Sequence, residues 1–321
     1  MKKKAFILIS LILVITMLTS CAPHPDIDLD SQTTPTPTPT EQPVISPTPT
    51  PSPTPTDPIE TPSPSPSIPD YIVIRGERYS TALTELILWN KDLYNDDIIP
   101  LKYMINLTAL DLSSNNISDL TPLADLTNLV GLALDSNQII DLNALEGLTN
   151  LKRLYLINNQ ISDLSPLSEL LQLDRLFISR NKISDLSPLT NLTRLTWLNL
   201  CENEITDLSP LANMVNLRQL SLDENQICDL SPLTGLSSLG ALHLEKNQIN
   251  DLTPLTNLIS LATLILNDNQ ITDISPLANL PRLYNFGLAN NPIEDWSPVE
   301  HLRGQQCCGP LGCDPLGTDP P

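Results

Sequence analysis

The sequence predicts an α/β repeat solenoid, with a parallel β-sheet on its concave side and short helical turns on its convex side. Two observations carry this prediction. Leucines alternate with other residues in short segments such as Leu154-x-Leu156, as they do in a strand with one buried face. The pattern recurs every 22 residues, nine times between residues 107 and 302. One such strand cannot bury its leucine face alone, whereas stacked copies share a continuous core.

Residues 1–21 have the three parts of an export signal. A basic start, Lys2–Lys4, is followed by an apolar stretch, Ala5–Met17. The next segment, Leu18-Thr19-Ser20-Cys21, resembles the lipobox of bacterial lipoproteins. The resemblance implies a palmitate-type anchor on Cys21 and a protein held at the outer face of the cell membrane. An uncleaved membrane helix is less favoured, because the apolar stretch is shorter than the roughly 20 residues that a span needs.

Residues 22–69 are expected to form a disordered stalk. Thr-Pro and Ser-Pro pairs fill Thr34–Pro69, and large apolar side chains are too few to offset the entropy of ordering the chain. Proline favours extended polyproline II, so the tract suits a passive spacer that lifts a folded domain through a cell wall.

Residues 70–106 are expected to cap the first repeat. The order Ile72–Ile74, Arg75–Glu77, Arg78–Thr81 predicts a small hairpin. A degenerate repeat follows, with Leu86 and Leu101 at a spacing slightly longer than 22 residues.

Residues 107–302 hold the nine regular repeats. One unit reads Leu151-x-x-Leu154-x-Leu156-x-x-Asn159-x-Ile161-x-Asp163-Leu164-Ser165-Pro166-Leu167-x-x-Leu170. It resembles the leucine-rich repeat, in the 22-residue form of the internalins and related surface proteins of low-GC Gram-positive bacteria. The resemblance covers about residues 71–302. It implies a horseshoe fold whose concave face binds a protein.

Two polar columns run through the repeats, from Asn115 to Asn291 and from Asp119 to Asp295. A buried asparagine satisfies both N–H and C=O groups of a turn, so we interpret the first column as structural. A row of aspartates could bind Ca²⁺, but this ion is coordinated by about six to eight oxygens at one site, and each repeat supplies one aspartate of the column. We therefore expect the aspartates to cap turns, and we expect no metal.

The helical turns and the far end follow from smaller signals. Ser165-Pro166 predicts an N-cap serine followed by proline at the first helical position. Asn143-Ala144 replaces this pair in the second repeat, where we expect a looser turn. Trp296, Val299 and Leu302 are expected to complete the last turn.

The cysteines give no firm site. Residues 303–321 are expected to be disordered, and Cys307, Cys308 and Cys313 lack the spacing of common zinc sites. A disulfide among them and no role at all both remain open. Cys201 and Cys228 fall at different places in adjacent repeats, so we do not expect them to pair.

Composition excludes several classes of function. The net charge of −20 argues against a nucleic-acid partner, because phosphate binding needs lysine and arginine. The histidines are His24, His243 and His301, and no Gly-rich phosphate loop or zinc helix motif occurs. No nucleophile, base and orienting group converge, so we expect neither an enzyme nor a cofactor, and we expect a monomer.

The candidate ligand site lies on the concave strands, because side chains alternate along a strand. It combines aromatic residues and arginines, the types that dominate interface energetics. Farther along the same face the side chains become acidic. The candidate ligand-binding residues are Arg153, Tyr155, Ile157, Arg175, Phe177, Arg180, Trp197, Asn199, His243 and Glu245.

Together these features predict an adhesin-like surface protein that recognises a protein ligand, for which a host-cell surface protein is one candidate. Binding of glycan or cell wall is an alternative. A surface-coat protein without a specific ligand is another.

Overall fold

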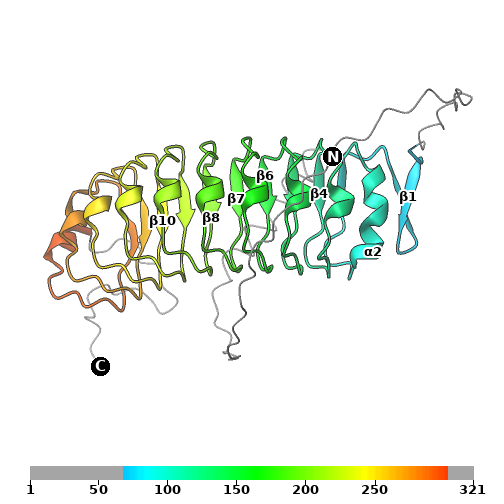
Figure 1. The fold of residues 1–321 in the computed structure, drawn as a ribbon. Helices are drawn as coiled ribbons and strands as arrows, with labels where there is room; N and C mark the ends of the chain where they lie inside the picture. Colours follow the sequence, from blue (N-terminus) through cyan, green and yellow to red (C-terminus); the bar gives the residue numbers. More distant parts are fainter. Residues whose placement is uncertain (1–67, 303–321) are drawn as a thin grey trace, which may run out of the picture. The chain divides into compact units, whose positions relative to one another are not determined.

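The computed structural model describes residues 68–302, which form a single solenoid (Figure 1). The N-terminal hairpin lies at one end of this stack, and the repeats follow one another in chain order. The predictions for the export signal, Cys21, the stalk and the C-terminal cysteines fall outside the described residues. Within residues 68–302, no helix has the length and apolar character needed to cross a membrane.

Ten short strands form one parallel sheet in strict sequence order. Equivalent leucines pair across it, as Leu176 with Leu198 and Leu198 with Leu220. The strands are β3 (Glu85–Ile87), β4 (Ala109–Asp111), β5 (Gly131–Ala133), β6 (Arg153–Tyr155), β7 (Arg175–Phe177), β8 (Trp197–Asn199), β9 (Gln219–Ser221), β10 (Ala241–His243), β11 (Thr263–Ile265) and β12 (Asn285–Gly287). The predicted solenoid with a parallel sheet is confirmed.

Short helical turns run along the side opposite the sheet (Figure 1). The degenerate first repeat contains α2 (Asn95–Ile98) followed by the 3₁₀ helix η1 (Ile99–Tyr103). Each regular repeat has one 3₁₀ helix. These are η2 (Thr121–Leu123), η3 (Asn143–Leu145), η4 (Ser165–Leu167), η5 (Ser187–Leu189), η6 (Ser209–Leu211), η7 (Ser231–Leu233), η8 (Thr253–Leu255), η9 (Ser275–Asn279) and η10 (Ser297–Leu302).

The core lies between the sheet and these turns, and every repeat contributes the same apolar positions. In the fifth regular repeat Leu198, Leu200 and Ile205 are fully buried, and Leu208 is 1% exposed. At the far end Val299 and Leu302 are buried and Trp296 packs against them, as predicted. The leucine and isoleucine columns therefore form one continuous core along the described chain.

The prediction of a serine N-cap is wrong. Leu164 occupies the N-cap position of η4 and makes no side-chain cap. Instead the Ser165 N–H donates to Oδ1 of Asp163 at 2.8 Å. The same bond recurs at 2.8–2.9 Å in all nine repeats. The aspartate column thus caps the turns, as expected.

The second repeat corrects another expectation. Its turn, η3, is as regular as the others, because the Asn143 N–H donates to Asp141 at 2.8 Å. The cap needs only a backbone N–H, which asparagine supplies as well as serine does. Where the residue is serine, its hydroxyl adds a second bond: Ser209 donates to Asp207 at 2.6 Å and lowers the pKa of that carboxyl.

The asparagine column joins each repeat to the one before it. Asn203 Nδ2 donates to the carbonyl of Ile178 in the preceding repeat at 3.1 Å and to that of Leu200 in its own at 3.0 Å. Its Oδ1 accepts the N–H of Ile183, also in the preceding repeat, at 3.0 Å. From Asn137 to Asn291 this acceptor bond recurs at 2.9–3.1 Å. The structural interpretation of the column is confirmed, and we call it the asparagine ladder.

The N-terminal hairpin closes the open end of the core. Strand β1 (Tyr71–Ile74) pairs antiparallel with β2 (Glu77–Ser80) through a two-residue turn. Arg75 and Gly76 have φ values of 46° and 84°, the left-handed pair that a tight hairpin turn requires. On β1 the side chains of Ile72 and Ile74 are buried. The two strands lie within the segment where the sequence predicts a hairpin.

Asn203→Ala should lower the free energy of unfolding by about 2–4 kcal/mol, because it leaves buried backbone groups without partners. Urea unfolding of the chain measures this. Asn216→Ala is the matched control: Asn216 is exposed and makes a single bond to the Thr193 carbonyl, so we expect less than about 1 kcal/mol. Equal midpoints for Asn203→Ala and the unaltered chain would contradict the ladder.

Candidate functional site

Three neighbouring strands bring the predicted aromatic residues together on the concave face. The rings of Tyr155 and Phe177 are stacked, with centroids 5.1 Å apart and an interplanar angle of 10°. Trp197 is in register with Arg175 rather than with Phe177, and its ring meets that of Phe177 diagonally, 5.3 Å away and tilted by 59°. Parallel pairing puts equivalent residues about 4.8 Å apart, a spacing that suits stacked rings.

Arginines flank this row. The guanidinium of Arg175 lies 5.3 Å from the ring centroid of Trp197, within the range of a cation–π contact. Arg153 pairs with Arg175 across β6 and β7 and is half-buried. We call Arg153, Tyr155, Arg175, Phe177 and Trp197 the aromatic–arginine patch.

Two members of the patch are less accessible than their strand position predicts. Phe177 is only 2% exposed and Tyr155 only 7%, because each ring is covered by its neighbours. Phe177→Ala should therefore lower stability as well as change the patch, since a buried ring contributes to packing. The same burial raises the pKa of the Tyr155 hydroxyl. Trp197, Arg153 and Arg175 are half-buried and form the accessible part of the patch.

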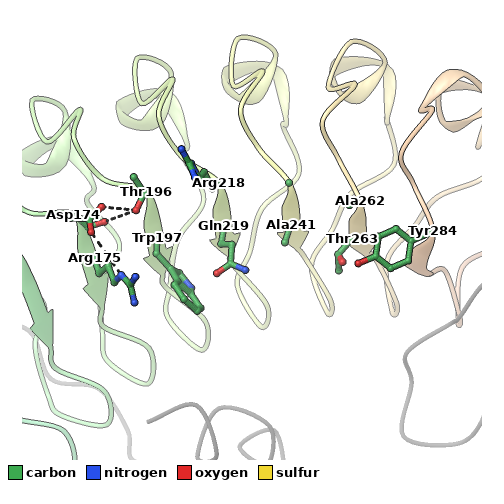
Figure 2. A pocket seen from close by; sticks show the side chains of 11 residues that line it. Asp174, Arg175, Thr196, Trp197, Arg218, Gln219, Ala241, Ala262, Thr263 and Tyr284 are labelled. Atoms are coloured by element: carbon green, nitrogen blue, oxygen red, sulfur yellow. Dashed lines mark hydrogen bonds and ion pairs between the residues drawn. The ribbon is translucent and has the colours of Figure 1, made fainter. Parts of the chain in front are cut away.

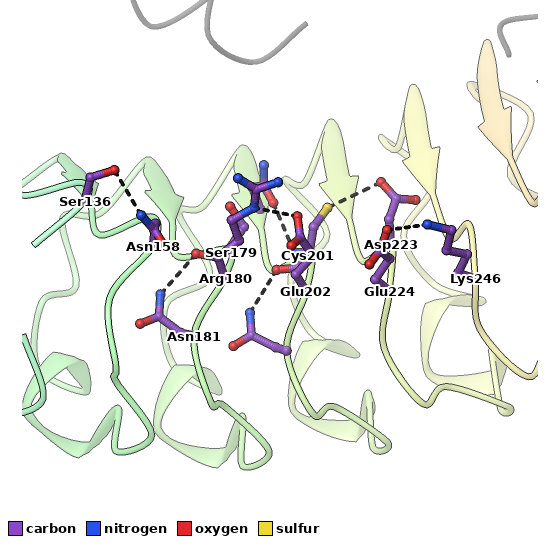
Figure 3. A network of polar contacts seen from close by, with 12 residues as sticks. Ser136, Asn158, Ser179, Arg180, Asn181, Cys201, Glu202, Asp223, Glu224 and Lys246 are labelled. Carbon is purple, nitrogen blue, oxygen red and sulfur yellow. Dashed lines mark hydrogen bonds and ion pairs between the residues drawn. The ribbon is translucent and has the colours of Figure 1, made fainter. Parts of the chain in front are cut away.

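Other predicted site residues have structural contacts of their own. Arg180 occupies a left-handed position with φ of 57°, and its Nε donates to Glu202 at 2.7 Å (Figure 3). The Ile157 N–H donates to Oδ1 of Asp135 at 2.7 Å. Asn199 Oδ1 accepts the N–H of Cys201 at 3.1 Å.

Arg180 belongs to a polar row in the loops that follow the strands, beside the asparagine ladder. In this row Lys246 pairs with Glu224 at 2.7 Å, and Asn158 donates to Ser136 at 3.3 Å (Figure 3). Each bond spans one repeat, so the row ties neighbouring loops together.

His243 and Glu245 lie apart from the aromatic–arginine patch. His243 Nδ1 is 4.0 Å from Oδ2 of Asp223, and Glu245 accepts a bond from Asn267 at 3.0 Å. Cys201 donates its thiol to Asp223 at 3.3 Å, and burial raises the pKa of the Asp223 carboxyl. Within residues 68–302, neither Cys201 nor Cys228 forms a disulfide. Among residues 68–302, no three histidine, cysteine or acidic side chains are placed to hold a metal ion.

A groove of about 640 Å³ adjoins the patch where strands β7 to β12 begin (Figure 2). Its floor is made of small residues, Gly240, Ala241 and Ala262, and Trp197 and Tyr284 stand toward its two ends. The lining is completed by Asp174, Arg175, Thr196, Arg218, Gln219 and Thr263.

Sequence reasoning missed most of the groove. The residue before each strand was not considered, and this column contains Asp174, Thr196, Arg218, Gly240, Ala262 and Tyr284. The sequence does contain a sign of the groove: in this column the small residues Gly240 and Ala262 stand between Arg218 and Tyr284. Such a gap in a column of larger residues produces a hollow.

The fold and its concave face define a leucine-rich-repeat solenoid, a class that typically serves as a non-enzymatic binding scaffold. The family model described as "Leucine Rich repeats (2 copies)" matches residues 149–191, 193–235 and 259–301. No curated protein matches the chain significantly.

Solved structures give a closer relationship. An internalin of Listeria monocytogenes, inlF, is 37% identical with a TM-score of 0.68, over 73% of this chain and 69% of that one. Internalin C2 of the same organism is 35% identical with a TM-score of 0.51, over 67% and 86%. A leucine-rich-repeat protein of Leptospira interrogans is 28% identical with a TM-score of 0.61, over 65% and 56%. The chain belongs to the internalin-like leucine-rich-repeat proteins.

Asp135, beside the aromatic–arginine patch, gives a pH-dependent prediction. Burial raises the pKa of its carboxyl to about 7, while the Ile157 N–H bond opposes the shift. The folded state therefore holds a proton that the unfolded chain releases near pH 4, and stability should fall as pH rises from about 4 to about 7.

Asp135→Asn keeps an oxygen acceptor for Ile157 and removes the charge. At pH 8 it should stabilise the chain by about 1–2 kcal/mol, and the gain should vanish near pH 5, where the native carboxyl is already protonated. Urea midpoints across this pH range measure the effect. A gain that is the same at pH 5 and pH 8 would mean that the titration of Asp135 is not its source.

Proposed function

We propose that this chain is a cell-surface binding protein that recognises a protein ligand through its concave face. The observation that carries the proposal is the aromatic–arginine patch, where half-buried Trp197 lies beside Arg175 on a sheet of fixed geometry. Tryptophan and arginine are enriched among the residues that dominate binding energy. Rigid aromatic side chains also lose little entropy when a partner docks.

Membership of the internalin-like proteins supports the same proposal, because scaffolds of this class typically bind other molecules. We further propose an acyl anchor on Cys21, which would hold the chain at the outer face of the membrane. Its support is the segment Leu18–Cys21 after an apolar stretch. The proline-rich tract would then separate the solenoid from the anchor.

Partner capture from host-cell surface extract tests the binding proposal. Against the captured protein, Trp197→Ala and Arg153→Ala should each weaken binding by about 1–3 kcal/mol, or roughly 5- to 150-fold, with unchanged urea midpoints. Tyr94→Ala removes a 53% exposed ring outside the patch and should bind normally. Normal binding by both patch variants would place the contact elsewhere.

Labelled palmitate tests the anchor. Cells that express the unaltered chain should incorporate the label, and Cys21→Ala should lose it, because no thioether can form. Cys228→Ala, which removes an exposed thiol within the solenoid, should keep the label. Incorporation that survives Cys21→Ala would refute lipidation at this residue.

A further inference from the structure

We propose that the groove between Trp197 and Tyr284 binds an extended, acidic peptide segment of the partner. This inference deepens the proposed function and rests on it, since it names the chemistry that one part of the concave face selects. Shape, unmet hydrogen bonds and charge each lead to it.

The shape of the groove suits an extended chain. Its floor of Gly240, Ala241 and Ala262 leaves a hollow that crosses the starts of successive strands (Figure 2). The groove lining runs from Arg175 on β7 to Tyr284, the residue before β12, which is five strand steps, about 24 Å at about 4.8 Å for each step. An extended peptide rises about 3.4 Å per residue, so about seven residues would fill this length.

Three polar atoms along this path have no hydrogen-bond partner among the described residues. They are Nε of Arg175 and Oε1 of Gln219, which belong to lining residues, and Oδ1 of Asn285, which follows the lining residue Tyr284. All three residues stand first in their strands, so they share one row across the sheet. These atoms are buried although the residues that carry them are half-buried, so we expect the side chains to rotate when a ligand supplies hydrogen-bond partners.

Such a row favours a ligand that offers both donors and acceptors at intervals. A peptide backbone does so at every residue, and an unpaired buried polar atom is costly to leave unmatched. An apolar ligand would give these atoms no hydrogen bonds, and Nε of Arg175 would keep only its ion pair with Asp174 at 3.8 Å. The pattern therefore favours a peptide over a lipid chain.

The charge of the groove is opposite to that of the protein. The chain as a whole carries −20, yet the charged residues of the groove are Arg175, Arg218 and Asp174. Asp174 is already engaged: its Oδ1 accepts the Thr196 hydroxyl at 2.6 Å, and its Oδ2 is 3.8 Å from Arg175. Arg218 is exposed and has no ion pair within residues 68–302.

An exposed arginine beside a hollow is suited to a carboxylate, which it can bind with two parallel hydrogen bonds. A neutral oligosaccharide would leave that charge unmatched. Charge thus separates an acidic peptide from a glycan, and Trp197 and Tyr284 offer rings at either end for apolar side chains of the same peptide.

Selection from a phage library of random nine-residue peptides tests the inference, with the purified full-length chain as bait. The selected peptides should be enriched in aspartate and glutamate. Arg218→Glu should weaken their binding at least tenfold, because it reverses the unpaired charge. Ala241→Trp should abolish binding by filling the groove. Its position already holds tryptophan in β8 and arginine in β7, so the sheet accepts a large side chain there.

Arg194→Glu is the matched control. It makes the same change of charge at an arginine whose guanidinium donates to Gln172 and which lies outside the groove lining. This variant should bind the selected peptides within twofold of the unaltered chain. Urea midpoints for all variants should stay unchanged, which separates lost binding from lost folding.

Three outcomes would overturn the inference. The first is a selection with no excess of acidic over basic peptides. The second is binding of the selected peptides that survives both Arg218→Glu and Ala241→Trp. The third is a glycan array that yields ligands whose binding is lost in Ala241→Trp, while the peptide library yields no ligand. If a protein partner loses binding to Trp197→Ala but binds Arg218→Glu and Ala241→Trp normally, the groove is not the binding site and the proposed function still holds.

Discussion

The rest of the structure depends on one amide side chain per repeat. Each ladder asparagine satisfies carbonyls in its own repeat and a carbonyl and an N–H in the preceding one, as Asn225 does with Leu222, Leu200 and Ile205. These bonds hold consecutive repeats in one register, so the strands of the parallel sheet pair in that same register. Because the register is constant, concave side chains line up in columns. Tyr155 and Phe177 share one column, and Trp197 stands in the neighbouring column with Arg153 and Arg175. In the same way, a run of small residues opens a groove.

A second constraint accompanies the ladder. The residue before each asparagine adopts a left-handed conformation, with φ between 52° and 57° from Ser114 to Asn290. That conformation is unfavourable for side chains such as those of Arg180 and Glu202. Their mutual ion pair offsets part of this cost, so charge in this row stabilises loops. The polar row therefore stabilises loops, whereas the patch offers a surface for binding. The two sets lie close together along the chain, and the sequence alone did not distinguish their roles.

The sequence predicted what a repeat decides by itself: the period, the buried columns and the aspartate caps. Properties that arise between repeats were harder to predict. Phe177 has the strand position of an exposed residue, and it is buried because the neighbouring repeats also carry aromatic rings. The groove needs the combined side chains of several repeats, and no single unit contains it. Serine is a common N-cap residue, which favoured Ser165 in the sequence. In the structure the carboxylate of Asp163, two residues earlier, accepts the Ser165 N–H and caps the turn.

The ladder also has a direction. Asn115 serves the cap, accepting the N–H of Leu93 and donating to the carbonyl of Leu88, and every later asparagine reaches backward in the same way. At the other end Ile293 donates to the carbonyl of Asn291 within its own repeat, since no further asparagine follows among the described residues. A ribosome makes the hairpin first, so each new repeat finds a finished surface on which to dock and completes the one made before it. A repeat stack can nucleate at any repeat and grow by adding neighbours, and a ladder that reaches backward favours growth in the order in which the chain is made.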